Sequence, residues 1–178
     1  MGMGSPETAV MATAVMADDS YRVIAAVGVR PQPPQGGFFI VGVETAMATY
    51  LWIAVGSALG GVARFWFSGL VARWIGETFP WGTILVNISG SFIIGFFATI
   101  TGPDGRVFAS SLTRQFVMIG ICGGYTTFSS FSLQTLTLAN DGEWLYAGGN
   151  VVVSVILCLL AVWAGHLLAT SLNTLQWG

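Results

Sequence analysis

The residues of this chain best suited to chemistry are uncharged hydrogen-bonding side chains inside long apolar segments. The densest group follows two glycines, in the run Cys-Gly-Gly-Tyr-Thr-Thr-Phe-Ser-Ser-Phe-Ser at residues 122–132. Asn87 lies in the middle of an earlier apolar segment, and Asn150 and Ser154 lie one helical turn apart, on one face, in a later one. Neutral donors along a route through lipid can replace the water of a small anion without trapping the ion by charge. The pattern therefore indicates anion transport.

The run at 122–132 lies in a stretch, 115–140, that contains no charged residue. This stretch is long enough to cross a bilayer, which takes about 20 helical residues. Its centre is poor helix-forming sequence, because glycines are followed by threonines and serines. A helix broken at membrane depth is tolerated only where the freed backbone groups face protein or water, and such breaks hold ion sites in transporters. We therefore predict a third membrane helix that is broken at its centre.

Charged residues divide the chain into four segments, each with the length of a membrane helix. The predicted spans are Thr45–Ala63, Thr78–Pro103, Gln115–Asn140 and Trp144–Thr170. Only 8% of the residues are charged, about a third of the roughly 25% usual in soluble domains. The predicted fold is thus an all-α membrane protein with a four-helix transmembrane domain at residues 45–170, located in the cell membrane as a multi-pass protein. Membrane lipid is then an expected partner.

The two ends of the chain differ from this domain. Residues 1–44 mix Ala, Met, Gly and Pro, include Pro31-Gln-Pro-Pro34, and are predicted to form a poorly ordered extension. Met47 is an alternative first residue. Residues 171–178 are predicted to form a short C-terminal tail.

Arginine placement gives no preferred orientation in the membrane. Arg64 and Arg73 flank the first loop, Arg106 and Arg114 lie in the second, and the chain has no lysine. A chain without orientation bias can insert both ways, which predicts an antiparallel dimer of two copies. Glycines one turn apart, Gly56 with Gly60 and Gly120 with Gly124, predict close helix pairing.

The sequence lacks the residues that several classes of function require. No basic patch for nucleic acid is present. Cys122 and Cys158 read as small buried hydrophobic residues, and His166 has no metal partner at ligand spacing, so an enzyme is not expected. A proton-coupled multidrug exporter of similar size needs an acidic residue in the membrane, and none lies within the spans. That exporter class and a non-transporting membrane scaffold remain the alternatives.

Four runs occur in a specific order. They are Gly60-Gly-Val-Ala-Arg64-Phe65, Phe79-Pro-Trp-Gly-Thr-Ile-Leu-Val-Asn87-Ile-Ser-Gly-Ser-Phe92, Gly120-Ile-Cys-Gly-Gly-Tyr-Thr-Thr-Phe-Ser-Ser-Phe-Ser132, and residues 154–165. In residue type, order and spacing, these runs resemble the fluoride channel family, also called Fluc or CrcB. The resemblance covers about residues 47–169.

The resemblance implies a fluoride-selective channel that exports F⁻ passively and relieves fluoride toxicity. It implies a dual-topology homodimer with two antiparallel pores, in which backbone carbonyls of Gly123 and Thr126 hold a structural Na⁺ at the dimer centre. Arg64 corresponds to a vestibule residue. The positions that match pore-lining or fluoride-lining residues are Asn87, Thr127, Phe128, Ser130, Phe131 and Ser154.

One position departs from the family pattern. Many members have a tyrosine one turn before the fourth-helix serine, where this chain has Asn150. An amide also donates hydrogen bonds, so conduction is compatible with this change. The resemblance does not cover residues 1–44, and some organisms pair two homologous subunits, so a heterodimer remains an alternative to the homodimer.

Overall fold

The computed structural model describes residues 43–175, and the side chains of residues 47–175. Regular structure in this part of the chain is helical, in the order α2 (Val43–Ile75), α3 (Trp81–Ile100), α4 (Ser111–Gln115), the π-helical segment η1 (Phe116–Cys122), α5 (Gly123–Tyr125), α6 (Phe128–Asn140) and α7 (Trp144–Thr174). Segments α4 to α6 follow one another as the third span. Within the described residues, 4 helical stretches are long and apolar enough to cross a membrane. The prediction of an all-α chain with four spans is confirmed.

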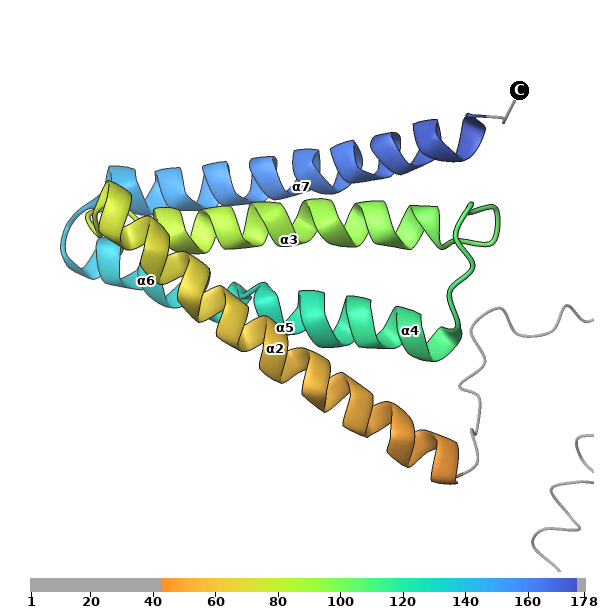
Figure 1. Ribbon diagram of the computed structural model, residues 1–178. Coiled ribbons are helices and arrows are strands. Elements are labelled where there is room, and N and C mark those ends of the chain that lie inside the picture. Colours follow the sequence, from red (N-terminus) through yellow and green to blue (C-terminus); the bar gives the residue numbers. More distant parts are fainter. Residues whose placement is uncertain (1–42, 176–178) are drawn as a thin grey trace, which may run out of the picture. The chain divides into compact units, whose positions relative to one another are not determined.

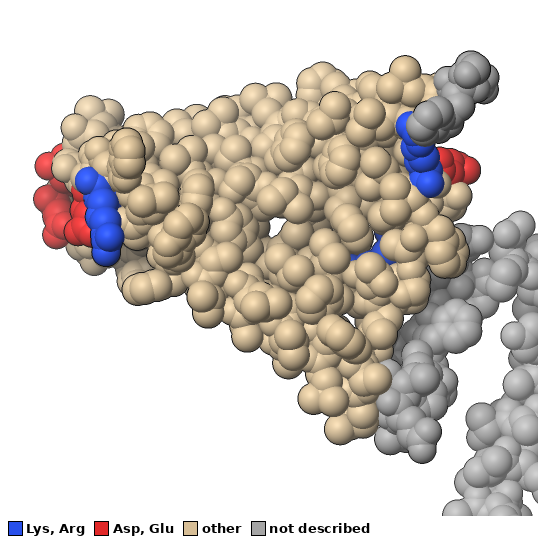
Figure 2. All heavy atoms as spheres, in the orientation of Figure 1, with Lys and Arg blue, Asp and Glu red and all other residues tan. Residues whose placement is uncertain are grey.

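Consecutive spans run in opposite directions (Figure 1). The α2–α3 and α6–α7 connections lie at one end of the helices, and the α3–α4 connection lies at the other with the end of α7. In the view of Figure 2, charged side chains gather at these two ends, with a broad uncharged belt between them. This distribution suits a bilayer, whose hydrocarbon core faces the belt.

The predicted end of the first span, at Ala63, is wrong. Helix α2 continues to Ile75, because no proline interrupts it and the first glycine with a positive φ, Gly76 at +94°, comes directly after Ile75. Arg64 therefore lies well inside α2, and its half-buried side chain lines a cavity there. Arginine is also a good helix former.

The two ends of the described chain differ in part from the prediction. Helix α7 reaches Thr174, so residues 171–174 of the expected tail are helical. The expected extension at residues 1–44 lies outside the described residues except for Val43 and Glu44, which begin α2.

The two glycine pairs pack against each other. A Cβ on Gly56 would lie 2.9 Å from Gly120 Cα, and a Cβ on Gly60 would lie 2.2 Å from Ile121 O. Gly124 is equally close to α2, since its Cβ would meet Ser57 O at 2.5 Å. The predicted close pairing is confirmed, and it joins α2 to η1 and α5.

Helices α3 and α7 lie side by side (Figure 1). Glycines again allow the two helix backbones to come close. A Cβ on Gly95 would meet Val162 O at 2.3 Å, and one on Gly165 would meet Phe92 O at 2.3 Å. Near the far end, Thr99 Oγ1 lies 2.9 Å from His166 Nδ1. The outward faces stay apolar and exposed, as at Leu59 on α2. Such faces suit contact with lipid or another protein.

Candidate functional site

The helical structure of the third span is interrupted at two threonines. Helix α5 ends at Tyr125 and α6 begins at Phe128. Between them, Thr126 has φ −77° and ψ 157°, and Thr127 has φ −151° and ψ 114°, so both are extended. Thr127 caps α6, because its Oγ1 accepts a hydrogen bond of 3.2 Å from the Ser130 amide. At such a break, backbone amide and carbonyl groups that would pair within a continuous helix need partners elsewhere.

Asn87 supplies two of those partners. Its Nδ2 donates to Thr127 O at 3.0 Å, and its Oδ1 accepts from the Thr127 amide at 2.7 Å. The side-chain amide therefore pairs with the backbone of a residue 40 positions later, as a neighbouring strand would. Asn87 thus has a structural task in addition to any contact with an ion.

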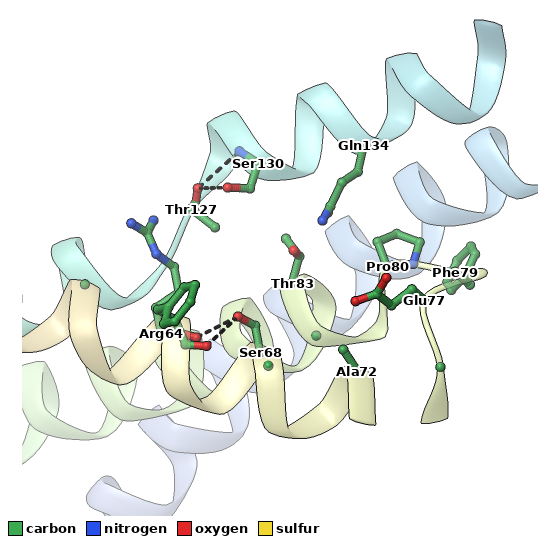
Figure 3. A pocket seen from close by; sticks show the side chains of 15 residues that line it. Arg64, Ser68, Ala72, Glu77, Phe79, Pro80, Thr83, Thr127, Ser130 and Gln134 are labelled. Atoms are coloured by element: carbon green, nitrogen blue, oxygen red, sulfur yellow. Dashed lines mark hydrogen bonds between the residues drawn. The ribbon is translucent and has the colours of Figure 1, made fainter. Parts of the chain in front are cut away.

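One cavity, which we call the polar cavity, lies between α2, α3 and α6 (Figure 3). It has a volume of about 630 Å³. Arg64 and Glu77 bring charge to its lining, and Thr83, Thr127, Ser130 and Gln134 bring neutral polar groups. Thr127 and Ser130 are hydrogen-bonded to each other at its wall, and Gln134 extends toward Thr83. This cavity is therefore suited to water and to a hydrated ion.

Gln134 is a residue that the sequence analysis missed. Its Oε1 is buried and has no hydrogen-bond partner within the described part of the chain. The signal was present in the sequence, because Thr127, Ser130 and Gln134 are spaced i, i+3 and i+7, which places them on one helix face. A buried acceptor beside a polar cavity is normally satisfied by water.

A second cavity, which we call the phenylalanine cavity, has a volume of about 300 Å³. Phe128 and Phe131 line it, with ring centroids 5.3 Å apart and ring planes at 50°. Phe131 is buried, whereas Phe128 is 77% exposed. Asn87 and Ser154 also line this cavity. The two residues are spaced i, i+3 on α6, which places their rings on one face of the helix.

Thr127 lines both cavities, and it is buried between them. The structure therefore divides the predicted site residues into two groups. Arg64 and Ser130 lie on the polar cavity, while Asn87, Phe128, Phe131 and Ser154 lie on the phenylalanine cavity. Cys122 and Cys158 are free thiols, and they also line the phenylalanine cavity.

Asn150 connects Ser154 to α6. The Asn150 Nδ2 donates to Thr135 Oγ1 at 2.8 Å, and the Ser154 hydroxyl donates to Asn150 Oδ1 at 3.3 Å. The side chain of Asn150 is 1% exposed, so it is an internal polar link between α6 and α7. The prediction that Asn150 and Ser154 share one face is confirmed.

The backbone around the break has the oxygen chemistry that an alkali cation needs. Gly123 and Thr126 line the phenylalanine cavity, and Gly123 is exposed. The last carbonyls of a helix lack the amide four residues later, so carbonyls near the end of α5 are open to other partners. The described residues contain no group of three or more His, Cys, Asp or Glu side chains that could hold a metal. Hard carbonyl oxygens would therefore be the ligands of a cation here.

Comparison with known proteins adds to this geometry. Residues 51–166 match the protein family described as CrcB-like protein, Camphor Resistance (CrcB). The chain is 63% identical over 130 residues to the fluoride-specific ion channel FluC of Opitutus terrae, an alignment that covers 73% of this chain and 98% of the relative. It is 62% identical over 125 residues to the protein of that name from Rhodospirillum rubrum, covering 70% and 97%. The protein of that name from Methylocella silvestris is 60% identical over 127 residues, covering 71% and 97%.

Proposed function

Since this chain belongs to the CrcB-like protein family, we propose that it is a fluoride-selective channel through which F⁻ leaves the cell passively, which relieves fluoride toxicity. It is a multi-pass membrane protein and not an enzyme. The observation that carries the proposal is the pair of cavities that meet at Thr127, in a chain that is 63% identical to a protein named as such a channel.

The polar cavity serves as the vestibule. Arg64 draws anions toward it, and the neutral groups of Ser130 and Gln134 meet the ion while it still keeps water. The phenylalanine cavity takes the ion after it passes Thr127. There Asn87 and Ser154 offer hydrogen-bond donors, and the rings of Phe128 and Phe131 offer their positive edges.

Selectivity follows from replacing water around a small ion. Fluoride is compact and strongly hydrated, so it needs several short contacts in exchange for its water. Chloride is larger and fits poorly between closely spaced donors. Because the donors are neutral, the ion is held weakly enough to leave again. A membrane potential of about 100 mV, negative inside, favours exit of one anion by about 2.3 kcal/mol.

An antiparallel dimer completes the pore in this proposal. Ser129, Ser132 and Gly123 are exposed in the single chain, beside the exposed ring of Phe128. Polar groups that face lipid are costly, so a protein partner is the better neighbour for this face. Arg73 lies at one end and Arg106 and Arg114 at the other, and a difference of one arginine is small enough to be compatible with insertion in both orientations. The partner is a second copy, with a homologous subunit as the alternative.

The structural cofactor of the proposed dimer is Na⁺. The carbonyls of Gly123 and Thr126 would hold it at the dimer centre, where it supplies positive charge that offsets the carbonyl dipoles of two interrupted helices. The residues of this chain then fix the position of the break, chiefly through the Asn87–Thr127 pairing.

The test is fluoride efflux from proteoliposomes that contain the purified full chain. Efflux is followed with a fluoride electrode after addition of valinomycin, and a parallel sample is loaded with chloride. We expect rapid release of fluoride and no comparable release of chloride. Release of both ions would refute selectivity. Folded dimer that releases neither ion, alone or with a homologous subunit from the same organism, would refute the channel.

A further inference from the structure

Nine serine and threonine hydroxyls in or directly after the helices share one hydrogen-bonding pattern. They donate to the backbone carbonyl four residues earlier, at 2.6–3.0 Å. The residues with this bond are Ser68, Ser89, Thr99, Thr101, Thr126, Ser132, Thr135, Thr137 and Ser171. A hydroxyl in this position has committed its single proton to the helix.

Ser154 departs from the pattern. Its hydroxyl donates to the side-chain oxygen of Asn150, and the distance of 3.3 Å is long for such a bond, whose usual value is about 2.7–2.8 Å. Ser154 is only 5% exposed, yet it lines the phenylalanine cavity with Phe128 and Phe131. Its proton is therefore weakly held at the wall of that cavity.

Asn150 is held in place from the neighbouring helix. Its Nδ2 donates to Thr135 Oγ1 at 2.8 Å, and Thr135 Oγ1 in turn donates to Phe131 O at 2.8 Å. With its amide nitrogen fixed in this way, the oxygen of Asn150 is directed at Ser154. The link thus runs from the backbone of Phe131, through two side chains, to a hydroxyl on α7.

We propose that Asn150 is a positioning residue for fluoride, which keeps the Ser154 hydroxyl away from its own helix and ready to donate to an anion in the phenylalanine cavity. This inference rests on the proposed function. When fluoride arrives, the Ser154 proton leaves a long, weak bond to a neutral oxygen and forms a charge-assisted bond to the ion, which is stronger. Without the Asn150 oxygen, Ser154 returns to the backbone carbonyl of residue 150, as its counterparts elsewhere do.

The test compares Asn150→Leu, Ser154→Ala and the double variant in planar bilayers, with fluoride current measured against fluoride concentration. We expect Asn150→Leu to raise the fluoride concentration for half-maximal current by roughly three- to tenfold, the effect of losing about one hydrogen bond. In the Ser154→Ala background, Asn150→Leu should cause no further shift. Asn140→Leu, at an exposed position of α6, is the matched control.

Three results would overturn the proposal: an unchanged half-maximal concentration, a loss of maximal current alone, or an equal shift in the Ser154→Ala background. Thr135→Val provides a second route, since it removes the acceptor that fixes Asn150; it should shift the half-maximal concentration in the same direction, while Thr137→Val should not. If Asn150→Leu does not fold, Thr135→Val decides. Absence of fluoride current in the unaltered protein would instead refute the proposed function.

Discussion

Replacing Gly60 by alanine tests the packing that holds the break in place. The new Cβ would lie 2.2 Å from Ile121 O and 2.7 Å from Tyr125 N, and real Cβ contacts essentially never fall below 3.0 Å. Helix α2 must therefore move away by at least about 0.8 Å, because backbone atoms cannot swing aside as a side chain can. Overpacking of this kind costs about 1–3 kcal/mol, and rigid neighbours place this case at the upper end.

The adjacent glycine provides the matched control. A Cβ on Gly61 meets nothing within 4 Å, so Gly61→Ala keeps only the benefit of alanine in a helix, up to about 1 kcal/mol. The same benefit reduces the cost of Gly60→Ala to about 2 kcal/mol. We therefore expect the two variants to differ by about 3 kcal/mol in the free energy of unfolding.

The assay is SDS-induced unfolding of the protein in mixed micelles, followed by tryptophan fluorescence. Gly60→Ala should also lower fluoride efflux, because displacement of α2 moves the chain segment just before Thr126 and Thr127. Equal stability of the two variants, within about 0.5 kcal/mol, would refute the packing argument.

Three further changes probe the site itself. Phe128→Ile should suppress fluoride efflux while size-exclusion chromatography still finds a dimer, because a ring edge facing the ion is lost; undiminished efflux would assign Phe128 to packing. Asn87→Ala should destabilise the fold by about 2 kcal/mol in the SDS titration. The backbone N–H and C=O of Thr127 both lose their side-chain partner, at about 1–3 kcal/mol each, and cavity water compensates in part. Asn140→Ala, at an exposed position, should have no effect, and equal values for the two variants would contradict the pairing. Replacement of Na⁺ by N-methyl-D-glucamine should lower both efflux and the thermal stability of the dimer, and no change in either would exclude a structural Na⁺.

The four spans could be predicted from sequence because long apolar stretches with few charges are typical of membrane helices. The turn between α6 and α7 was also visible, as Asn140-Asp-Gly142 places a glycine where φ is +82°. The end of α2 could not be predicted in this way. Arg64 looked like the edge of the membrane, but its half-buried side chain lines the polar cavity and the helix continues beyond it.

The partners within the site were beyond the reach of spacing rules. The pairing of Asn87 with Thr127 depends on how far α3 slides along the third span, and that register is set by many contacts at once. The same holds for the link from Asn150 to Thr135, which joins α7 to α6. Gln134 is different, because its helical spacing from Ser130 was available in the sequence.

In the proposed channel, the polar cavity attracts the ion and the phenylalanine cavity lets it pass. Arg64 lines the polar cavity, where water can weaken its hold on an anion, and the donors on the phenylalanine cavity carry no charge. Those donors are also partly engaged already. Asn87 donates one of its two side-chain N–H groups to Thr127, which leaves one free to meet an ion. Ser154 donates its only hydroxyl proton to Asn150. An ion that reaches the phenylalanine cavity therefore competes for shared protons and is bound weakly. Weak binding at this step is what a passive channel requires, because an ion held tightly there would block the one behind it.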